Sequence, residues 1–281
     1  QRLVGSEMCI RDRNRDLEKL TPKDIMFRKA IYHSGFKFGL LLLSTITFIG
    51  VFVPFFVDMS PYDQDISKRL LPPVWSEGGS WQYIFGTDGN GRDYLARIIY
   101  GTRVSLTIGI GAATVGMLIG VTLGVIAGYF GGFVDQVVSY ILTCQLALPG
   151  ILFLLTIISI VGSSLTVVIL VIGVLHWTLF LVVTRAATQR IRNLDYITAA
   201  NAIGARKTNI IFTDILPNVL NQIIVIFTLE VGVAILAEAT ISFLGLGIQP
   251  PTPSWGVLIA EGKEAIFCLL YTSDAADERR R

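Results

Sequence analysis

Residues Asp195–Asn218 read DYITAANAIGARKTNIIFTDILPN and form a polar, basic, helix-capable insert between two long apolar runs. The small residues Ala199, Ala200 and Gly204 give the insert a helix face with little side-chain bulk, so another surface can approach the backbone closely. Leu216-Pro217 is predicted to end the insert, because proline cannot donate to the preceding turn but suits the first turn of a following helix. An insert of this kind in a membrane protein indicates a partner.

The composition predicts that the chain lies in a lipid bilayer. Hydrophobic residues make up 52% of the chain and charged residues 16%, with a mean hydropathy of +0.63, far from a soluble domain. A spanning helix needs about 20 mostly apolar residues. Five runs meet this length: Phe36 to Val57, Val104 to Phe130, Val134 to Val161, Leu165 to Val183 and Val219 to Leu246. We therefore expect an all-α polytopic bundle, with its third helix bent at Pro149.

The distribution of charge predicts the orientation of the spans. Lysines and arginines precede the first run and follow the fourth, which places both segments in the cytoplasm by the positive-inside rule. Residues 58–100 mix acidic and basic side chains and are expected outside. The formal net charge of +2 is too small to indicate a nucleic-acid partner.

The cysteines and the residues within the spans give no sign of catalysis or of a cofactor. Cys9, Cys144 and Cys268 are scattered, without the spacing of metal ligands or of a disulfide framework. No HExxH motif and no membrane-embedded aspartate pair is present in the sequence. We expect no catalytic site, no metal and no cofactor.

The insert resembles the EAA loop of ATP-binding-cassette importer permeases, which has an Ala-Ala pair, a glycine four residues later and a closing Leu-Pro. Thr198 replaces the glutamate of that pattern, and Asp214 replaces a hydrophobic residue. The resemblance implies an ATPase-coupling loop. The residues assigned to it are Asp195, Tyr196, Ala199, Ala200, Gly204, Ala205, Arg206, Lys207, Leu216, Pro217 and Asn218.

Three further blocks narrow the resemblance to the second permease of the dipeptide, oligopeptide and nickel importer family. They are FGTDGNGRDYLARIIYGTRVSLTIG at Phe85–Gly109, DILPN at Asp214–Asn218 and EATISFLGLGIQPPTPSWG at Glu238–Gly256, accompanied by SPYD at Ser60–Asp63. This likeness covers roughly residues 20–266. It implies a type I permease fold in the bacterial inner membrane. The implied partners are a homologous second permease, two cytoplasmic ATP-binding subunits and an external substrate-binding protein.

The family pattern includes a sixth span, which the sequence does not show. After Trp255-Gly256 only Ala265 to Leu270 is apolar, too short to cross a bilayer. We expect residues 1–19 to be foreign or disordered, 20–35 to be cytoplasmic and 267–281 to be a foreign tail. The transmembrane domain is expected over 36–266, with an external loop at 58–103 and a cytoplasmic coupling loop at 185–218.

The external segment GTDGNGRD resembles two ligand-binding loops only in part. Arg92 and Asp93 stand where a P-loop needs Lys and Ser or Thr, and no acidic residue near Ile99 closes an EF-hand. A compact turn is favoured over a substrate contact, and both remain open. The candidate residues are Gly86, Thr87, Asp88, Gly91, Arg92 and Asp93.

Three ionisable residues within the spans are candidates for the translocation path or for polar contacts inside the bundle: His176, Glu230 and Glu238. Glycines at Gly116, Gly120, Gly124 and Gly128 recur every four residues, which favours helix packing over a wall of the path. The sequence therefore predicts a permease subunit of an ATP-binding-cassette importer for peptides or a related small solute. The alternatives are an ATP-independent secondary transporter or channel, and an intramembrane enzyme.

Overall fold

The computed structural model describes residues 32–56 and 59–263. Within these residues the chain is helical and contains no β-strand, only an isolated bridge between Thr87 and Asp93. The predicted all-α class is confirmed. The expectations for residues 1–19 and 267–281 lie outside the described part of the chain.

Contacts within the chain divide it into two units, residues 1–53 and 54–281. The described part of the first unit is most of helix α3 (Ser34–Phe56). Most of its side chains are apolar, as expected of a membrane-spanning helix. Its hydroxyl groups find partners within the helix, since Ser44 and Thr45 both donate to the Leu41 carbonyl.

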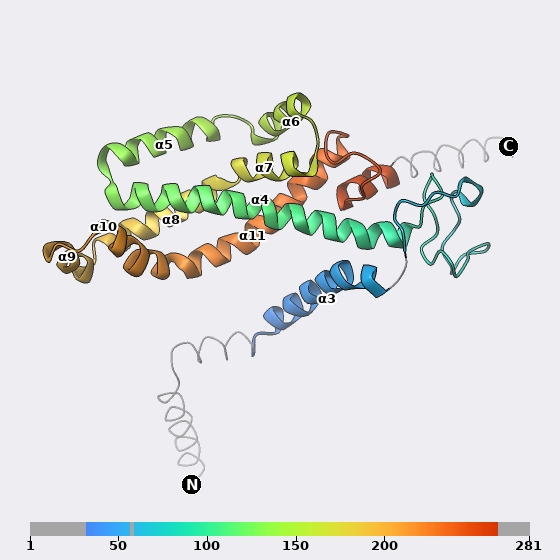
Figure 1. Cartoon of the computed structure of the whole chain (residues 1–281), viewed down its shortest axis with the longest axis horizontal. Coiled ribbons are helices and arrows are strands. Elements are labelled where there is room, and N and C mark those ends of the chain that lie inside the picture. The colour runs from blue at the N-terminus through green and yellow to red at the C-terminus, as the bar shows by residue number, and fades with distance from the viewer. Residues whose placement is uncertain (1–31, 57–58, 264–281) are drawn as a thin grey trace, which may run out of the picture. The chain divides into compact units, whose positions relative to one another are not determined.

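The second unit is built around one long helix, α4 (Tyr94–Phe130), shown in Figure 1. Its 37 residues correspond to about 55 Å at 1.5 Å per residue, far more than the roughly 30 Å of a bilayer core. The apolar part begins at Val104, so the first ten residues of α4 extend beyond the predicted span. The last ten residues of the predicted external loop, 94–103, are therefore helical and belong to α4.

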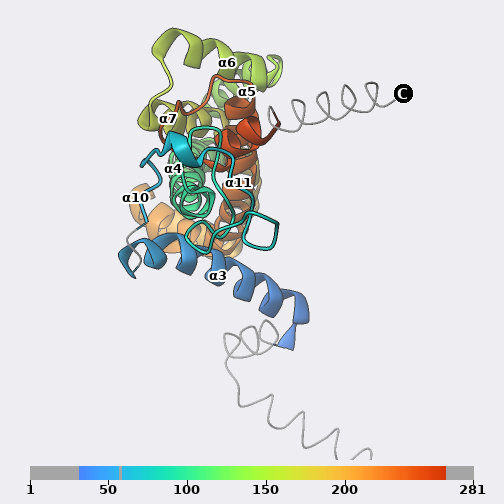
Figure 2. The same ribbon diagram turned by 90° about the vertical axis from the view of Figure 1, so that its right-hand side faces the viewer.

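The other helices run beside α4 or across it (Figures 1 and 2). They are α5 (Gly132–Leu146), α6 (Gly150–Val161), α7 (Leu165–Leu175), α8 (Trp177–Arg192) and α11 (Leu216–Phe243), with short elements η1 (Ile66–Lys68), α9 (Asp195–Ala202), α10 (Lys207–Asn209) and η2 (Ile210–Ile215). The most extensive packing is between α4 and α8, followed by α11 and α7 against α4. A last helical segment covers residues 255–263.

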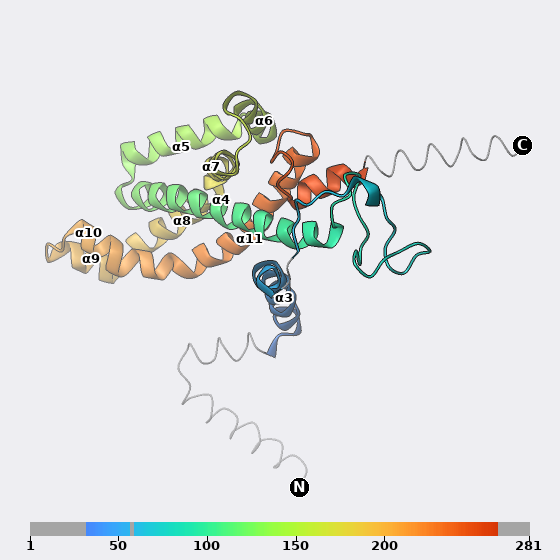
Figure 3. The ribbon, with the colours of Figure 1, turned by 45° about the vertical axis from the view of Figure 1, so that its right-hand side comes forward.

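The third predicted span is broken rather than merely bent. Helices α5 and α6 meet at 83° across residues 147–149, and Figure 3 shows α6 running across the direction of α5. Pro149 is the N-cap residue of α6, because a proline starts a helix more readily than it continues one. The described chain thus has four helices able to span a membrane, or five if the broken pair counts as one.

The fourth and fifth predicted spans are helical over more residues than their apolar runs. Residues Leu165–Arg192 form one span candidate, interrupted only at His176, and Lys207–Phe243 form another. Pro217 lies in the first turn of α11, as predicted, but Leu216-Pro217 does not interrupt the helical run between the insert and the fifth span. Pro217 lies inside a continuous helical run, and the turn before it is a π-helix, η2.

The glycines of α4 pack this helix against α7 and α8. A Cβ atom at Gly120 would overlap the Trp177 carbonyl oxygen, and one at Gly124 would lie 2.9 Å from the Leu181 carbonyl oxygen. At Gly128 it would lie 2.7 Å from the Thr188 Cβ. Only glycine permits this approach of backbones, so these positions serve helix packing rather than a wall of the path.

Accessibility to a label tests the predicted orientation. With the three native cysteines replaced by serine, we expect single cysteines at Thr208 and Gln82, both exposed, to react with a membrane-impermeant maleimide from opposite sides of the membrane. Reaction of both from the same side would show that the number of spans between them is wrong.

Candidate functional site

Helix α9 forms the exposed end of the polar insert and is anchored by one side chain. Ile197 is fully buried, in a cluster that also contains Tyr129, Ile191, Ile210 and Ile215. Burial of an isoleucine contributes roughly 1.5–3 kcal/mol. This anchor holds α9 in place, because a helix of 8 residues is too short to be stable alone.

Gly204 ends α9 in a Schellman motif. Its φ is +80°, its N–H donates to the Asn201 carbonyl at 3.1 Å, and the Ala205 N–H donates to the Ala200 carbonyl at 3.0 Å. Glycine adopts this left-handed conformation without the penalty that a Cβ imposes. Gly204 is therefore required by the turn itself, a role that the sequence argument did not assign to it.

The small residues of the insert do not share one exposed face. Ala199 and Gly204 are exposed, whereas Ala200 and Ala205 pack against the buried cluster of Ile197. Of the other predicted coupling residues, Leu216 is half-buried against the same cluster and the remainder are mostly exposed: Asp195, Tyr196, Arg206, Lys207, Pro217 and Asn218.

Exposed apolar side chains surround α9, and the sequence argument missed most of them. Ile203 is 85% exposed and Phe212 67%, with Leu194 and Tyr196 also exposed. We call Leu194, Tyr196, Ala199, Ile203 and Gly204, with Arg206, Lys207 and Phe212, the coupling surface. An apolar group rimmed by basic side chains outside the predicted spans is typical of a protein interaction site. The signal in the sequence was Ile203, an apolar residue just before the helix-ending glycine.

The coupling surface is joined to the end of α4. The Tyr129 hydroxyl donates to Asn201 Oδ1 at 3.3 Å, and the Lys207 ammonium lies 5.6 Å from the centre of the Phe130 ring, within the range of a cation–π interaction. On the other side the insert continues directly into α11 through η2. A displacement of α9 would therefore reach both α4 and α11.

The π-helix before Pro217 has a local cause. A proline ring clashes with the carbonyl four residues earlier in an α-helix, and here the Leu216 N–H donates to the Ile211 carbonyl five residues back. Asn218 Nδ2 donates to the Asp214 carbonyl at 2.6 Å, giving that group a partner. The wider turn thus accommodates Leu216-Pro217 without ending the helix.

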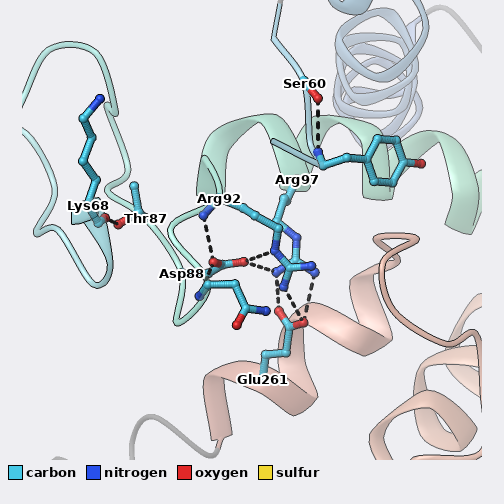
Figure 4. Close-up of polar contacts among 9 residues, drawn as sticks. Ser60, Lys68, Thr87, Asp88, Arg92, Arg97 and Glu261 are labelled. Atoms are coloured by element: carbon cyan, nitrogen blue, oxygen red, sulfur yellow. Dashed lines mark hydrogen bonds and ion pairs between the residues drawn. The ribbon is translucent and has the colours of Figure 1, made fainter. Parts of the chain in front are cut away.

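At the opposite end of α4 lies a network of four charged side chains, shown in Figure 4. Arg97 donates to Asp88 Oδ2 at 2.6 Å and to both oxygens of Glu261. Arg92 donates to the same Asp88 oxygen at 2.7 Å and to Glu261 at 3.2 Å. Arg97 is fully buried, and Asp88 is 7% exposed. The network ties the external loop to α4 and to the helix at 255–263.

The charge on Asp88 is stabilised by its neighbours. Burial alone would raise its pKa, but hydrogen bonds from the backbone N–H groups of Arg92 and Asn90 and from the Arg92 side chain hold the pKa of Asp88 below its ordinary value. Sequence reasoning placed Asp88 and Arg92 in one turn and missed Arg97 and Glu261. Glu261 follows Asp88 by 173 positions, so no local pattern could have revealed the pair.

The remaining candidate residues of the external loop stabilise its turn. Thr87 Oγ1 donates to the Lys68 carbonyl at 2.5 Å and accepts from the Leu71 N–H at 2.9 Å. Asp93 is the N-cap residue of α4. Gly86 and Gly91 have φ of +77° and +74°, and at each a Cβ would overlap a backbone carbonyl oxygen. Every one of these residues has a structural role, which favours the compact turn over a substrate contact.

The structure brings together two of the three ionisable residues within the spans. His176 Nδ1 lies 2.6 Å from Glu230 Oε2, although 54 residues separate them, so each polar group has a partner away from water. Glu238 is elsewhere and fully buried, and its Oε1 accepts from Ser242 at 2.7 Å and from Ser254 at 2.8 Å. In the described chain no group of three metal-ligating side chains is present.

The described chain thus has a long central helix, with the exposed insert at one end of it and the external loop, held by ion pairs, at the other. Comparison with known proteins identifies the family. Residues 120–273 match the family described as the binding-protein-dependent transport system inner membrane component. The chain belongs to this family.

Curated relatives that are also transport permeases are similar to this protein over most of its length. The di/tripeptide transport system permease protein DppC of Pseudomonas aeruginosa is 35% identical, over 88% of this chain and 81% of its own length. The dipeptide transport system permease protein DppC of Haemophilus influenzae is 38% identical, over 82% of this chain and 78% of its own length. DppC of Escherichia coli K12 is 37% identical, over 86% of this chain and 81% of its own length.

A solved structure of the MetNI methionine ABC transporter, facing inward, is more distant. It has 18% identity and a TM-score of 0.48, over 65% of this chain and 94% of its own. The family match itself makes this protein an inner-membrane permease component of a binding-protein-dependent transport system. The predicted recognition and localisation are confirmed.

Proposed function

We propose that this permease imports short peptides and that the coupling surface docks a cytoplasmic ATP-hydrolysing subunit. Its relatives are dipeptide and di/tripeptide permeases, which supports the solute class. The coupling surface supports the second part, because it presents exposed apolar and basic groups on a helix whose underside is fixed in the core.

The proposed complex contains four kinds of component. They are this chain, a homologous second permease, two cytoplasmic ATP-binding subunits and an external substrate-binding protein. ATP hydrolysis belongs to the partner subunits. The external loop, whose base is fixed by Arg97, is the proposed contact for the binding protein, since Trp75 and Trp81 are 69% and 83% exposed there.

The observation that carries this proposal is the mechanical connection beneath the coupling surface. An importer must convert movement of its ATPase subunits into a change of access across the membrane. The coupling surface is joined to two membrane helices. Contacts of Ile197 and Tyr129 link it to α4, and the continuous helical run from Lys207 links it to α11. Movement of a docked subunit would thus displace the bundle rather than only a flexible loop.

Substitution of Gly204 tests the docking. We expect Gly204→Trp to reduce binding-protein-stimulated ATP hydrolysis and copurification of the ATPase subunits by roughly tenfold, equivalent to about 1.4 kcal/mol, because an indole would project into the space that the partner occupies. The matched control is Gly204→Asn, since asparagine tolerates the left-handed conformation and is small. Normal stimulated hydrolysis in the Trp variant, with the protein inserted in the membrane, would contradict the proposal.

A second variant tests the apolar centre of the coupling surface without disturbing the turn. Ile203 is 85% exposed, so Ile203→Asp should leave the permease folded while placing a charge in an apolar contact. We expect loss of ATPase copurification and of uptake, with normal amounts of permease in the membrane. Ile66→Asp is the control, because Ile66 is 78% exposed on the external loop. Equal copurification of the ATPase subunits with the two variants would argue against a contact at Ile203.

A further inference from the structure

A cavity of about 580 Å³ lies where two interrupted helices face each other. One wall contains the break between α5 and α6, with Leu148, Gly150 and Ile151, and another contains the interruption between α7 and α8, with Leu175 and His176. Ala237 and Thr240 of α11 complete it. Its volume is within the range of small-molecule sites, about 300–1,000 Å³.

The polar groups of the cavity are held by neighbours in the bundle. Gln145 accepts a hydrogen bond from the Trp177 indole N–H, and its Nε2 donates to the Leu175 carbonyl at 2.9 Å, which links α5 to the interruption at His176. The His176 ring is oriented by Glu230 at 2.6 Å. In the described chain the other ring nitrogen, Nε2, has no hydrogen-bond partner, and it is not among the fully buried atoms.

We propose that this cavity is a binding subsite for the transported peptide within the membrane. The inference rests on the proposed function, because the solute class is taken from the related dipeptide and di/tripeptide permeases. The apolar wall, including Ile151 and Leu154, would receive a side chain of the peptide, and His176 Nε2 would hydrogen-bond a polar group of its main chain. Glu230, which lies behind His176 and does not line the cavity, is the positioning residue.

The contrast between the walls and the polar groups favours a peptide over a lipid chain. An acyl chain needs only apolar walls, and a carboxylate such as Glu230 in the bilayer is costly without a role. A peptide needs both an apolar surface and a few oriented hydrogen-bonding groups. Interrupted helices at a solute site are also a recurring feature of membrane transporters, since they allow polar contacts at membrane depth.

Cys144 provides a direct probe, because it lines the cavity and is exposed. In the assembled transporter, with Cys9 and Cys268 replaced by serine, we expect a saturating dipeptide to slow the reaction of Cys144 with N-ethylmaleimide at least threefold. The peptide is added directly, without the binding protein and without nucleotide, so that turnover does not change the conformation. An unchanged rate would overturn the proposal, as would slowing by phospholipid alone.

Two isoleucines of α6 give a matched pair of variants. Ile151 lines the cavity, whereas Ile160, on the same helix, does not, and both are exposed. We expect Ile151→Trp to lower dipeptide uptake at least tenfold and to abolish the protection of Cys144, with Ile160→Trp close to the parent. An equal loss in both variants, or normal uptake by Ile151→Trp, would overturn the proposal.

The same measurements separate this inference from the proposed function. ATP hydrolysis stimulated by the empty or loaded binding protein depends on the coupling surface and should remain in both α6 variants. If it remains while dipeptide leaves Cys144 unprotected, the subsite is wrong and the importer function stands. If no ATPase subunit assembles with the unaltered permease, the proposed function itself fails.

Discussion

Replacement of Arg97 by methionine is expected to lower the free energy of unfolding by about 3–5 kcal/mol, the range for removing one partner of a buried ion pair. The guanidinium is fully buried and contacts both Asp88 and Glu261. Methionine would leave Asp88 with only Arg92 as a charged partner, and would leave the Arg92–Glu261 pair as the remaining described ion pair between the external loop and the helix at 255–263. Thermal unfolding of the purified permease in detergent measures the change.

The matched control is Arg69→Met, because Arg69 is exposed on the same loop and makes no ion pair among the described residues. We expect this control to unfold within about 0.5 kcal/mol of the parent, as is usual for surface substitutions. Similar unfolding of the two variants would show that the network at Arg97 contributes little.

The network also predicts a dependence on pH. The pKa of Asp88 is lowered in the folded protein, so its contribution is fully present above the unfolded pKa of about 3.9 and is lost as the pH falls through the folded value. We expect the stability difference between the parent and Asp88→Asn to shrink below about pH 4. A difference that stays constant to lower pH would contradict this assignment.

Replacement of Gly120 by alanine is expected to disrupt the contact between α4 and α8. A Cβ at this position would overlap the Trp177 carbonyl oxygen and lie 2.6 Å from the Phe180 Cβ. Backbone atoms cannot move aside as a flexible side chain can, so the helices must separate, at a cost of about 1–3 kcal/mol or more. The measurement is the same unfolding experiment, together with the amount of folded protein in the membrane.

Gly232→Ala is the matched control for Gly120→Ala. Gly232 lies within α11, and a Cβ there would meet no atom within 4 Å. Alanine is favoured over glycine in a helix by about 1 kcal/mol, so this control should be neutral or stabilising. A neutral result at Gly120 would mean that α4 and α8 do not pack as closely as the structure indicates.

Much of the fold followed from local patterns in the sequence. Runs of about 20 apolar residues predict spanning helices because backbone groups need internal partners in lipid. The glycines at Gly116, Gly120, Gly124 and Gly128 predicted a packing face because their spacing follows the helix period. The ends of helices were harder to predict from the sequence, because α4 and α8 continue beyond their apolar parts and polarity does not by itself end a helix.

The candidate sites were predicted only in part. The small residues of the insert were found from their spacing, but the sequence could not show that Ala200 points into the core while Ala199 and Ile203 point outward. That difference depends on how α9 rotates when Ile197 is buried, which is set by packing against Tyr129 and Ile215.

The sequence by itself determined the class of this protein and its location in a membrane, and it singled out the segment proposed for coupling, because hydrophobicity, helix period and turn chemistry act over short distances along the chain. Only the tertiary structure decided which charged groups meet: Arg97 with Glu261, and His176 with Glu230. The partners in each pair are far apart in the sequence, and a buried charge requires a partner of suitable geometry but carries no local signal of which one it is.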